Sequence, residues 1–433
     1  MNTIYHWLKT IWRLKAYIIL LLLSTHYSTI VAAQPDTALA SQIRMELQSR
    51  KTLPLYFPKS VKRFYTSRNF KPVWLISEKG EAGHAWQAMV MLDCVLQYGL
   101  SHADYHPDEL NYGVLHDILQ QQGKVSLEQQ SRFEIMLTDA MLTLMVHLHY
   151  GKLNPELPAT KIDAGYGDMR MEAVLTQAVR QPNIEATLLA VQPKGEAYTE
   201  MQHWMHKWKG QYLDDCYEIP EANVRKVAIN MERLRWAAIG AGKYMQVNIP
   251  SFRLSLFLPD KTYQFKVVTG KPSTPTPLLH SRVGAIDMQA KMIWPDQLQT
   301  VTLVPQNTES SMLRFAFSSR YKVALTEIKE TNWFNQKQRA LTTGDIGVEK
   351  AERLAMLLLQ ADHQQNKTMA LRQGRLTGSA VSVKLRVPIP IKVTYITCWF
   401  QDAQLMTYPD IYQLDNQLEQ AIYHERPKKL SER

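Results

Sequence analysis

Two segments, Val323-Ala-Leu-Thr-Glu-Ile-Lys329 and Arg339-Ala-Leu-Thr-Thr-Gly-Asp-Ile-Gly-Val348, decide how this chain is interpreted. The first predicts a strand, and the second predicts a glycine-bearing turn that leads into a helix. This order is typical of loops that present a reactive side chain at a helix N-terminus, where free backbone N–H groups stabilise an anion. The side chains presented here are hydroxyl and carboxyl groups, without Cys or His: Thr326, Thr343 and Asp345.

The composition is that of a folded protein with more than one domain. The chain has 433 residues, of which 45% are apolar and 21% are charged, and this length favours two or three domains. The formal charge is +10, and the first 33 residues contribute three basic groups and no acidic ones, which leaves +7. This charge suits a protein near anionic polymers or lipid surfaces. It is too diffuse to predict nucleic-acid binding, and no recognition motif accompanies it.

The N-terminal residues resemble a secretory signal. A basic segment precedes the apolar run Ala16–Leu23, and Val31-Ala32-Ala33 offers a small-residue cleavage site. The alternative is an uncleaved membrane anchor, but the run is short for a span of roughly 20 residues. We therefore expect residues 1–33 to be a signal peptide and the protein to be exported.

The cysteines do not form a disulfide scaffold, because only three are present, Cys94, Cys216 and Cys398, at wide spacing. After export, Cys94 and Cys216 could pair in an oxidising compartment. The alternative is buried free thiols, since Cys94 lies in an apolar helical pattern and Cys398 in an apolar strand pattern.

Apolar periodicity divides the chain into a helical first half and a strand-rich second half. Residues 34–215 have helical patterns, including a helix that a capping box opens at Ser126. We expect residues 216–240 to hold a connecting helix, Glu221–Trp236, and residues 241–433 to form a domain rich in strands. The predicted fold class is α+β, with a helical scaffold domain followed by a β-rich domain.

The histidines do not predict a metal site. His147 and His149 point about 200° apart on a helix, so they cannot share one ion. His102, Asp104 and His106 lie around a proline and are explained as cap and turn residues. We expect no metal and no cofactor.

The helix Glu221–Trp236 carries several basic residues, among them Arg225, Arg233 and Arg235. A basic helix can mark a membrane surface or an anionic partner. The alternative, which we prefer, is a connecting helix whose apolar face packs on the next domain.

Ordered motifs run through both halves of the chain. The second half contains Asn230-Met-Glu-Arg-Leu-Arg-Trp236, Val247-Asn-Ile-Pro250, Val268-Thr-Gly-Lys271, Thr274-Pro-Thr-Pro277, Arg339-Ala-Leu-Thr-Thr-Gly344, Pro388–Thr397 and Asp410–Asp415. The first half contains Phe64-Tyr65, Trp74, Gly99-Leu100, Asp104-Tyr-His106, Leu137-Thr-Asp-Ala140 and Tyr150–Pro155. Together they resemble the large L,D-transpeptidases of Gram-negative envelopes, which join a helical scaffold to a YkuD-type catalytic domain. The resemblance covers nearly all of the chain after the expected signal and implies a periplasmic location.

The resemblance also implies a chemistry. The family cross-links peptidoglycan: a Cys thiolate attacks a stem tetrapeptide, a His takes the thiol proton, and backbone N–H groups hold the oxyanion. The alignment puts Thr326 at the His position, Asp345 at the Cys position and Gly347 at the position of a family Arg. Threonine cannot accept a proton as imidazole does at neutral pH, and a carboxylate is a weak nucleophile toward an amide. The resemblance therefore implies a degenerate, inactive member.

Two larger parts of the family also look reduced. No peptidoglycan-binding module fits between the scaffold and Val224, and only a short segment stands where the family has a long lid insertion. Loss of reactive groups, lid and binding module together favours a changed function over a single chance substitution.

Three functions stay open from the sequence. The first is a pseudoenzyme that binds peptidoglycan stem peptides or another cell-wall enzyme in the old cleft, through candidates Arg339, Thr343, Gly344 and Glu327. The second is an active transferase or hydrolase in which Glu327 and Asp345 act as a carboxylate pair on a muropeptide. The third is an anchoring component that contacts a membrane surface through the basic helix. An open cleft around Thr326 would favour binding, and a filled one a structural role.

Overall fold

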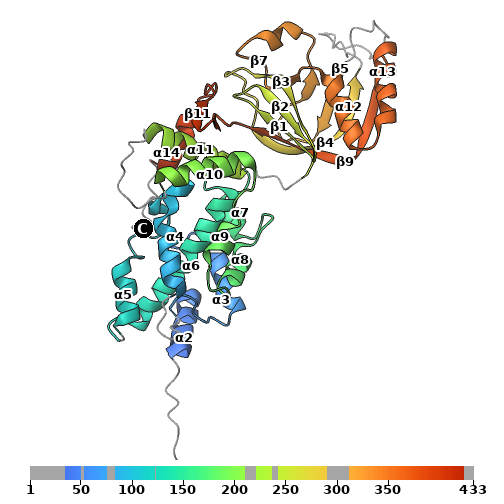
Figure 1. The fold of residues 1–433 in the computed structure, drawn as a ribbon. Coiled ribbons are helices and arrows are strands. Elements are labelled where there is room, and N and C mark those ends of the chain that lie inside the picture. Colours follow the sequence, from blue (N-terminus) through green and yellow to red (C-terminus); the bar gives the residue numbers. More distant parts are fainter. Residues whose placement is uncertain are drawn as a thin grey trace, which may run out of the picture.

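The computed structural model describes residues 35–49, 53–75, 83–121, 123–209, 221–236, 242–289 and 312–423. The expected signal segment and Cys216 lie outside these ranges. Figure 1 shows a helical part formed by the first half of the chain and a β-rich part formed by the second half. The predicted α+β class is confirmed.

Ten α-helices and two 3₁₀ turns make up the described portion of the helical part. Their bounds are α2 Pro35–Gln48, α3 Pro58–Ser67, α4 Gly83–Asp93, η1 Val95–Tyr98, η2 His102–Asp104, α5 Tyr112–Gln120, α6 Leu127–Tyr150, α7 Ala159–Asp163, α8 Met171–Ala178, α9 Glu185–Leu189, α10 Glu196–Lys209 and α11 Glu221–Trp236. The predicted capping box opens α6, where the Ser126 hydroxyl accepts a hydrogen bond from the Gln129 N–H.

Helix α6 is the centre of this part, because nearly all of its length from Phe133 onward is buried. Its two buried acidic residues hold neighbouring segments in place. The carboxylate of Asp139 accepts hydrogen bonds from the N–H groups of Tyr56 and Phe57, both at 2.8 Å. The carboxylate of Glu134 accepts from three successive N–H groups, those of residues 73 to 75. Burial raises the pKa of Glu134 to about 7.

The β-rich part is a nine-stranded sheet with the order β2-β1-β9-β4-β5-β6-β8-β3-β7, and an extra β2–β3 pairing curls it back on itself. The strands are β1 Tyr244–Asn248, β2 Arg253–Phe257, β3 Thr262–Gly270, β4 Leu279–Gln289, β5 Met312–Phe317, β6 Leu325–Glu327, β7 Ala340–Thr342, β8 Ile346–Val348 and β9 Val381–Thr394. The helical elements of this half are η4 Thr331–Asn335, α12 Ala351–Ala361, η5 Gln365–Lys367 and α13 Thr368–Thr377. Inward residues of the strands pack with α12 into one apolar core.

One local prediction is wrong. The turn at Gly344 does not lead into a helix, because strand β8 follows it and α12 begins only at Ala351. After residue 380 the chain forms one long strand, β9. Its Pro388 lies where the β4–β9 register shifts, so its missing N–H costs no ladder hydrogen bond.

The end of the described chain returns to the helical part. Strands β10 Cys398–Gln401 and β11 Gln404–Thr407 form a separate two-stranded sheet, and helix α14 Leu414–Tyr423 follows it. Figure 1 places β11 and α14 beside α10 and α11. Apolar side chains of β10 share a buried cluster with those two helices. Within the described residues, no helix combines the length and the apolar character that crossing a membrane requires.

The buried ring of His147 on α6 gives a test of the helical packing. Burial lowers the pKa of His147 to about 3, so the ring is neutral when folded and protonates near pH 6.5 when unfolded. Its contribution to stability is therefore present above pH 6.5 and is lost as the pH falls. Between pH 7 and pH 5 this loss is about 2 kcal/mol. Urea unfolding at both pH values should show that His147→Gln has a smaller loss than the wild type.

The matched control is His203→Gln, because His203 is an exposed residue of α10. This variant should keep the wild-type difference between pH 7 and pH 5. The same pH dependence in His147→Gln and the wild type would contradict the assignment of a neutral buried ring.

Candidate functional site

The three positions that the resemblance assigned to reactive residues lie on or next to two neighbouring strands. Thr326 of β6 and Gly347 of β8 are direct partners in a parallel pair, and Asp345 comes just before β8. These three residues, which are up to 21 positions apart in the sequence, therefore lie at one place in the sheet.

The space beside Gly347 is filled. A Cβ atom added at Gly347 would lie 2.0 Å from Cγ1 of Ile328 and 2.9 Å from Cγ2 of Val268. These distances are shorter than a carbon–carbon contact allows, so even alanine would force its neighbours to move. An arginine side chain has no room at this position.

Asp345 serves the backbone. Its side chain is exposed, and its Oδ1 accepts a hydrogen bond from the N–H of Ala324 at 2.8 Å. Its carbonyl oxygen accepts a second one from the hydroxyl of Thr342 at 2.5 Å. Both contacts tie the turn before β8 to its surroundings.

Glu327 is held away from Asp345. Its carboxylate is bound by the guanidinium of Arg375 on α13, with a shortest distance of 2.8 Å, and by the N–H of Leu313 at 3.2 Å. Ala324, the partner of Asp345, precedes Glu327 by three residues, which is roughly 10 Å along a strand. The predicted carboxylate pair for hydrolysis is therefore not assembled.

Arg339 has a structural position as well. Its guanidinium donates hydrogen bonds to the carbonyl oxygens of Val267, Gln336 and Phe252, at distances of 2.8 to 3.1 Å. It also lies over the ring of Phe252, 5.2 Å from the centroid. Burial lowers the pKa of Arg339. Backbone carbonyls before β2, within β3 and after η4 thus occupy the donor groups that a ligand would need.

The glycine turn is packed against two other loops. Gly344 has φ +114°, and its carbonyl accepts a hydrogen bond from the hydroxyl of Thr276 at 2.9 Å. A Cβ at Gly270 would lie 2.2 Å from a backbone oxygen, so only glycine fits there. The hydroxyl of Tyr412 bridges this region, because it donates to the Gly270 carbonyl at 2.6 Å and accepts from the Thr276 N–H at 3.2 Å. Thr343 is exposed beside this packed turn.

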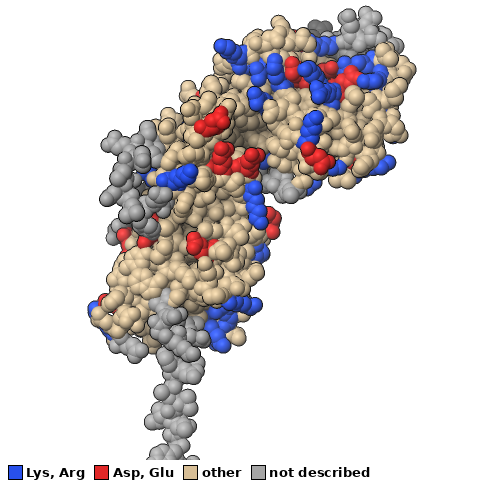
Figure 2. All heavy atoms as spheres, viewed as in Figure 1, with Lys and Arg blue, Asp and Glu red and all other residues tan. Residues whose placement is uncertain are grey.

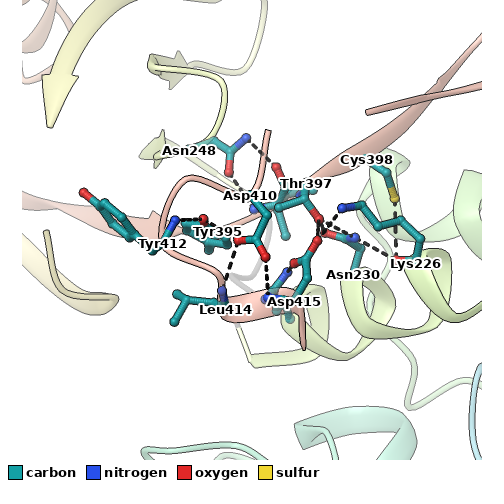
Figure 3. Close-up of polar contacts among 12 residues, drawn as sticks. Lys226, Asn230, Asn248, Tyr395, Thr397, Cys398, Asp410, Tyr412, Leu414 and Asp415 are labelled. Carbon is teal, nitrogen blue, oxygen red and sulfur yellow. Dashed lines mark hydrogen bonds and ion pairs between the residues drawn. The ribbon is translucent and has the colours of Figure 1, made fainter. Parts of the chain in front are cut away.

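A buried polar joint lies where the segment from Tyr395 to Asp415 meets α11 (Figure 3). The carboxylate of Asp415 on α14 forms ion pairs with Lys226 and Arg233 of α11 and accepts a hydrogen bond from the Thr397 hydroxyl at 2.8 Å. The side chain of Asn230 accepts a hydrogen bond from the Thr397 N–H at 2.7 Å. These contacts fix the strand after β9 and the start of α14 on the helical part.

Asp410 caps the helix that carries Asp415 and so supports this joint. Its carboxylate accepts hydrogen bonds from the N–H groups of Leu414 and Asp415, at 3.0 and 2.9 Å, which satisfies the first turn of α14. The hydroxyl of Tyr395 donates to the same carboxylate at 2.6 Å and accepts from the Tyr412 N–H at 2.7 Å. Figure 3 shows these side chains converging. The sequence motifs Asn230–Trp236 and Asp410–Asp415 marked both segments, but nothing in the sequence indicated that they contact each other.

The predicted basic helix is α11, but two of its three arginines are buried and so do not form an exposed basic face. Arg233 and Arg235 are only 3% and 2% exposed. Arg235 donates to the carbonyl of Tyr98 at 2.6 Å, inside the helical part. Arg225 pairs at the surface with Glu221 and Glu419. The helix therefore packs against both α10 and the elements β10 and α14 near the end of the described chain.

The histidines considered for metal binding each have another partner. Nδ1 of His147 contacts the hydroxyl of Tyr105 at 3.0 Å, and His106 contacts Asp139 at 2.7 Å. His149 contacts Asp168, and His102 contacts a backbone carbonyl. The residues that the structure describes contain no group of three or more His, Cys, Asp or Glu that could hold an ion.

Of the cysteines, Cys398 is buried, as expected, and burial raises the pKa of its thiol to about 12. Such a thiol is not a nucleophile at neutral pH. The suggested pairing of Cys94 with Cys216 involves a residue outside the described ranges.

Comparisons with known proteins support the resemblance. Residues 59–205 match the family model described as the Scaffold domain, which corresponds to the stretch from α3 into α10. A curated Haemophilus influenzae protein named "Putative L,D-transpeptidase" is 25% identical over 247 residues, covering 46% of this chain and 50% of that protein. The chain therefore aligns with about half the length of this relative. These matches show a scaffold domain in the first half of the chain and a similarity to a putative L,D-transpeptidase, whereas the loss of activity stays a prediction.

The filled space at Gly347 predicts a clear stability difference between two glycines. Gly347→Ala should lower the free energy of unfolding by about 1–3 kcal/mol, because the new methyl group overlaps Ile328 and Val268. The control is Gly284→Ala in β4, where no atom lies within 4 Å of the added Cβ, so the change should stay within about 0.5 kcal/mol. Urea unfolding measures both. Equal effects would show that the space beside Gly347 is open.

Proposed function

We propose that this chain is a periplasmic cell-wall protein of L,D-transpeptidase descent that does not carry out transpeptidation and acts by binding peptidoglycan stem peptides or another cell-wall enzyme. Because the place around Thr326 is filled, this binding uses another surface of the chain. The observation that carries the loss of transpeptidation is the environment of Thr326, Asp345 and Gly347. Thr326 of β6 and Gly347 of β8 are neighbours and Asp345 precedes β8, yet the three residues offer no thiolate, no imidazole and no room for a guanidinium.

The chemistry supports this conclusion. Acyl transfer from a stem peptide needs a strong nucleophile, a base with a pKa near neutral and donors for the oxyanion. The carboxylate of Asp345 and the hydroxyl of Thr326 supply neither of the first two. The backbone donor nearest Asp345, the Ala324 N–H, is already used by the Asp345 side chain.

The alternative is an active transferase or hydrolase that uses Asp345. A carboxylate pair with Glu327 would favour it, but Glu327 is neutralised by Arg375 on a different element. The same ion pair gives Glu327 a structural role between β6 and α13. The alternative therefore depends on Asp345 alone, which would have to form a high-energy anhydride.

Membrane contact through α11 has weaker support. Of its three arginines, only Arg225 reaches the surface. Figure 2 shows basic and acidic side chains interspersed over the face in view, without a field of one sign. Binding to anionic lipid through scattered charges of both signs would be weak and sensitive to salt.

The proposal predicts that purified protein incubated with tetrapeptide muropeptides forms no cross-linked dimers. Chromatography and mass spectrometry of the products measure this. The full chain should also bind isolated peptidoglycan sacculi in a sedimentation assay. Asp345→Asn should change neither result, because the carboxylate only accepts one backbone hydrogen bond at the surface.

Cross-linked or hydrolysed muropeptide that disappears in Asp345→Asn would overturn the proposal in favour of the enzyme. Glu327→Gln serves as a second control. It removes the ion pair with Arg375 and should affect stability without creating or removing a product.

A further inference from the structure

A cavity of about 290 Å³ lies between the helical part and the sheet, away from Thr326 and Asp345. Its helical wall comes from the segment after α6 and from the end of α11. Its other wall comes from the start of β4, the end of β9 and the loop after β5. The apolar and aromatic side chains that line it include Pro155, Trp236, Leu278, Leu279, Val393 and Tyr395.

The two aromatic walls of this cavity are fixed in place. The ring nitrogen of Trp236 donates to the carboxylate of Glu232 at 2.8 Å. The hydroxyl of Tyr395 is bonded to Asp410, and its ring stacks on Tyr412 with centroids 5.6 Å apart. Rigid walls lower the entropic cost of binding, because they need not be ordered by the ligand.

The polar groups at the back of the cavity are already satisfied. Arg233 is paired with Asp415, and the side chain of Asn154 bonds to the Tyr150 carbonyl and to nearby N–H groups. A ligand would therefore meet an apolar interior, and the rim would have to supply its polar contacts.

Charges of both signs meet at the rim. Glu156 of the helical part lies 3.8 Å from His280 and 3.7 Å from Arg320 of the sheet part. These separations exceed a hydrogen bond, and the Arg320 side chain is 60% exposed. Exposed pairs of this kind contribute about 0–1 kcal/mol. A ligand that carries its own charges can replace them at little cost.

We propose that this cavity binds a short zwitterionic peptide, with its carboxylate at Arg320 and His280, its ammonium at Glu156 and its apolar groups against Trp236 and Tyr395. The inference rests on the proposed binding function and names its site. An anion alone would leave Glu156 unmatched, and a cation alone would leave Arg320 unmatched. The volume is near the lower end of ligand pockets, roughly 300–1,000 Å³, so it fits two residues or the end of a longer peptide.

Isothermal titration calorimetry on the full chain tests the proposal with two probes. One is the free stem tetrapeptide of peptidoglycan, and the other is the dipeptide Leu-Ala. Arg320→Glu should weaken binding at least tenfold, because it reverses the charge that meets the carboxylate. Arg353→Glu is the matched control. Arg353 is exposed on α12, which contributes no residue to the lining of the cavity, so this variant should bind the probes as the wild type does.

A second variant tests the role of the apolar interior. Leu278→Trp places a larger side chain in the cavity and should abolish binding, and thermal unfolding shows whether the variant is folded. Tight binding of the tetrapeptide alone would assign the site to cell-wall stems. Equal binding of both peptides would assign it to free short peptides in general.

The outcomes separate this inference from the proposed function. Binding of neither probe, or tetrapeptide binding that Arg320→Glu and a folded Leu278→Trp leave unchanged, overturns the cavity assignment. Sedimentation with sacculi would then still test the binding function independently. Formation of cross-linked muropeptides overturns the proposed function whatever the cavity binds.

Discussion

The ion pairs of Asp415 with Arg233 and Lys226 hold the two parts of this molecule together. Burial by itself would raise the pKa of Asp415, but the two cations and their hydrogen bonds hold that pKa below its ordinary value. Loss of one partner would leave a buried charge uncompensated, which is costly, at about 3–5 kcal/mol. This joint fixes where β10 and α14 lie. It also fixes the wall of the cavity that Tyr395 forms.

From the joint, hydrogen bonds continue to the glycine turn before β8. Asp410 binds Tyr395, the Tyr395 hydroxyl meets the backbone of Tyr412, and the Tyr412 hydroxyl bridges Gly270 and Thr276. Thr276 in turn binds the carbonyl of Gly344. The loops around Gly344 thus have structural partners that hold the turn in its conformation.

Much of the fold followed from local sequence signals, and the site followed only in part. Helix α11 has the predicted bounds, because its segment has clear apolar periodicity. Strand β8 is only three residues long and contains Gly347, so it carries no strand pattern, and the helix after it was placed too early. Ile328 fills the space beside Gly347, and Arg375 pairs with Glu327. Both contacts arise from tertiary packing, so local sequence composition could not predict them.

The return of α14 to α11 makes this a molecule whose sequence order and spatial order differ. Arg233 and Asp415 are 182 residues apart in the chain, and the whole sheet is formed between them. Closing so long a loop is slow, because its entropy must be lost before the contact stabilises anything. The face of α11 that carries Lys226 and Arg233 therefore stays uncovered until the sheet has folded and α14 has docked. Opening the sheet part would release α14 and expose that face again, so the two parts should unfold as one cooperative unit despite their separate cores.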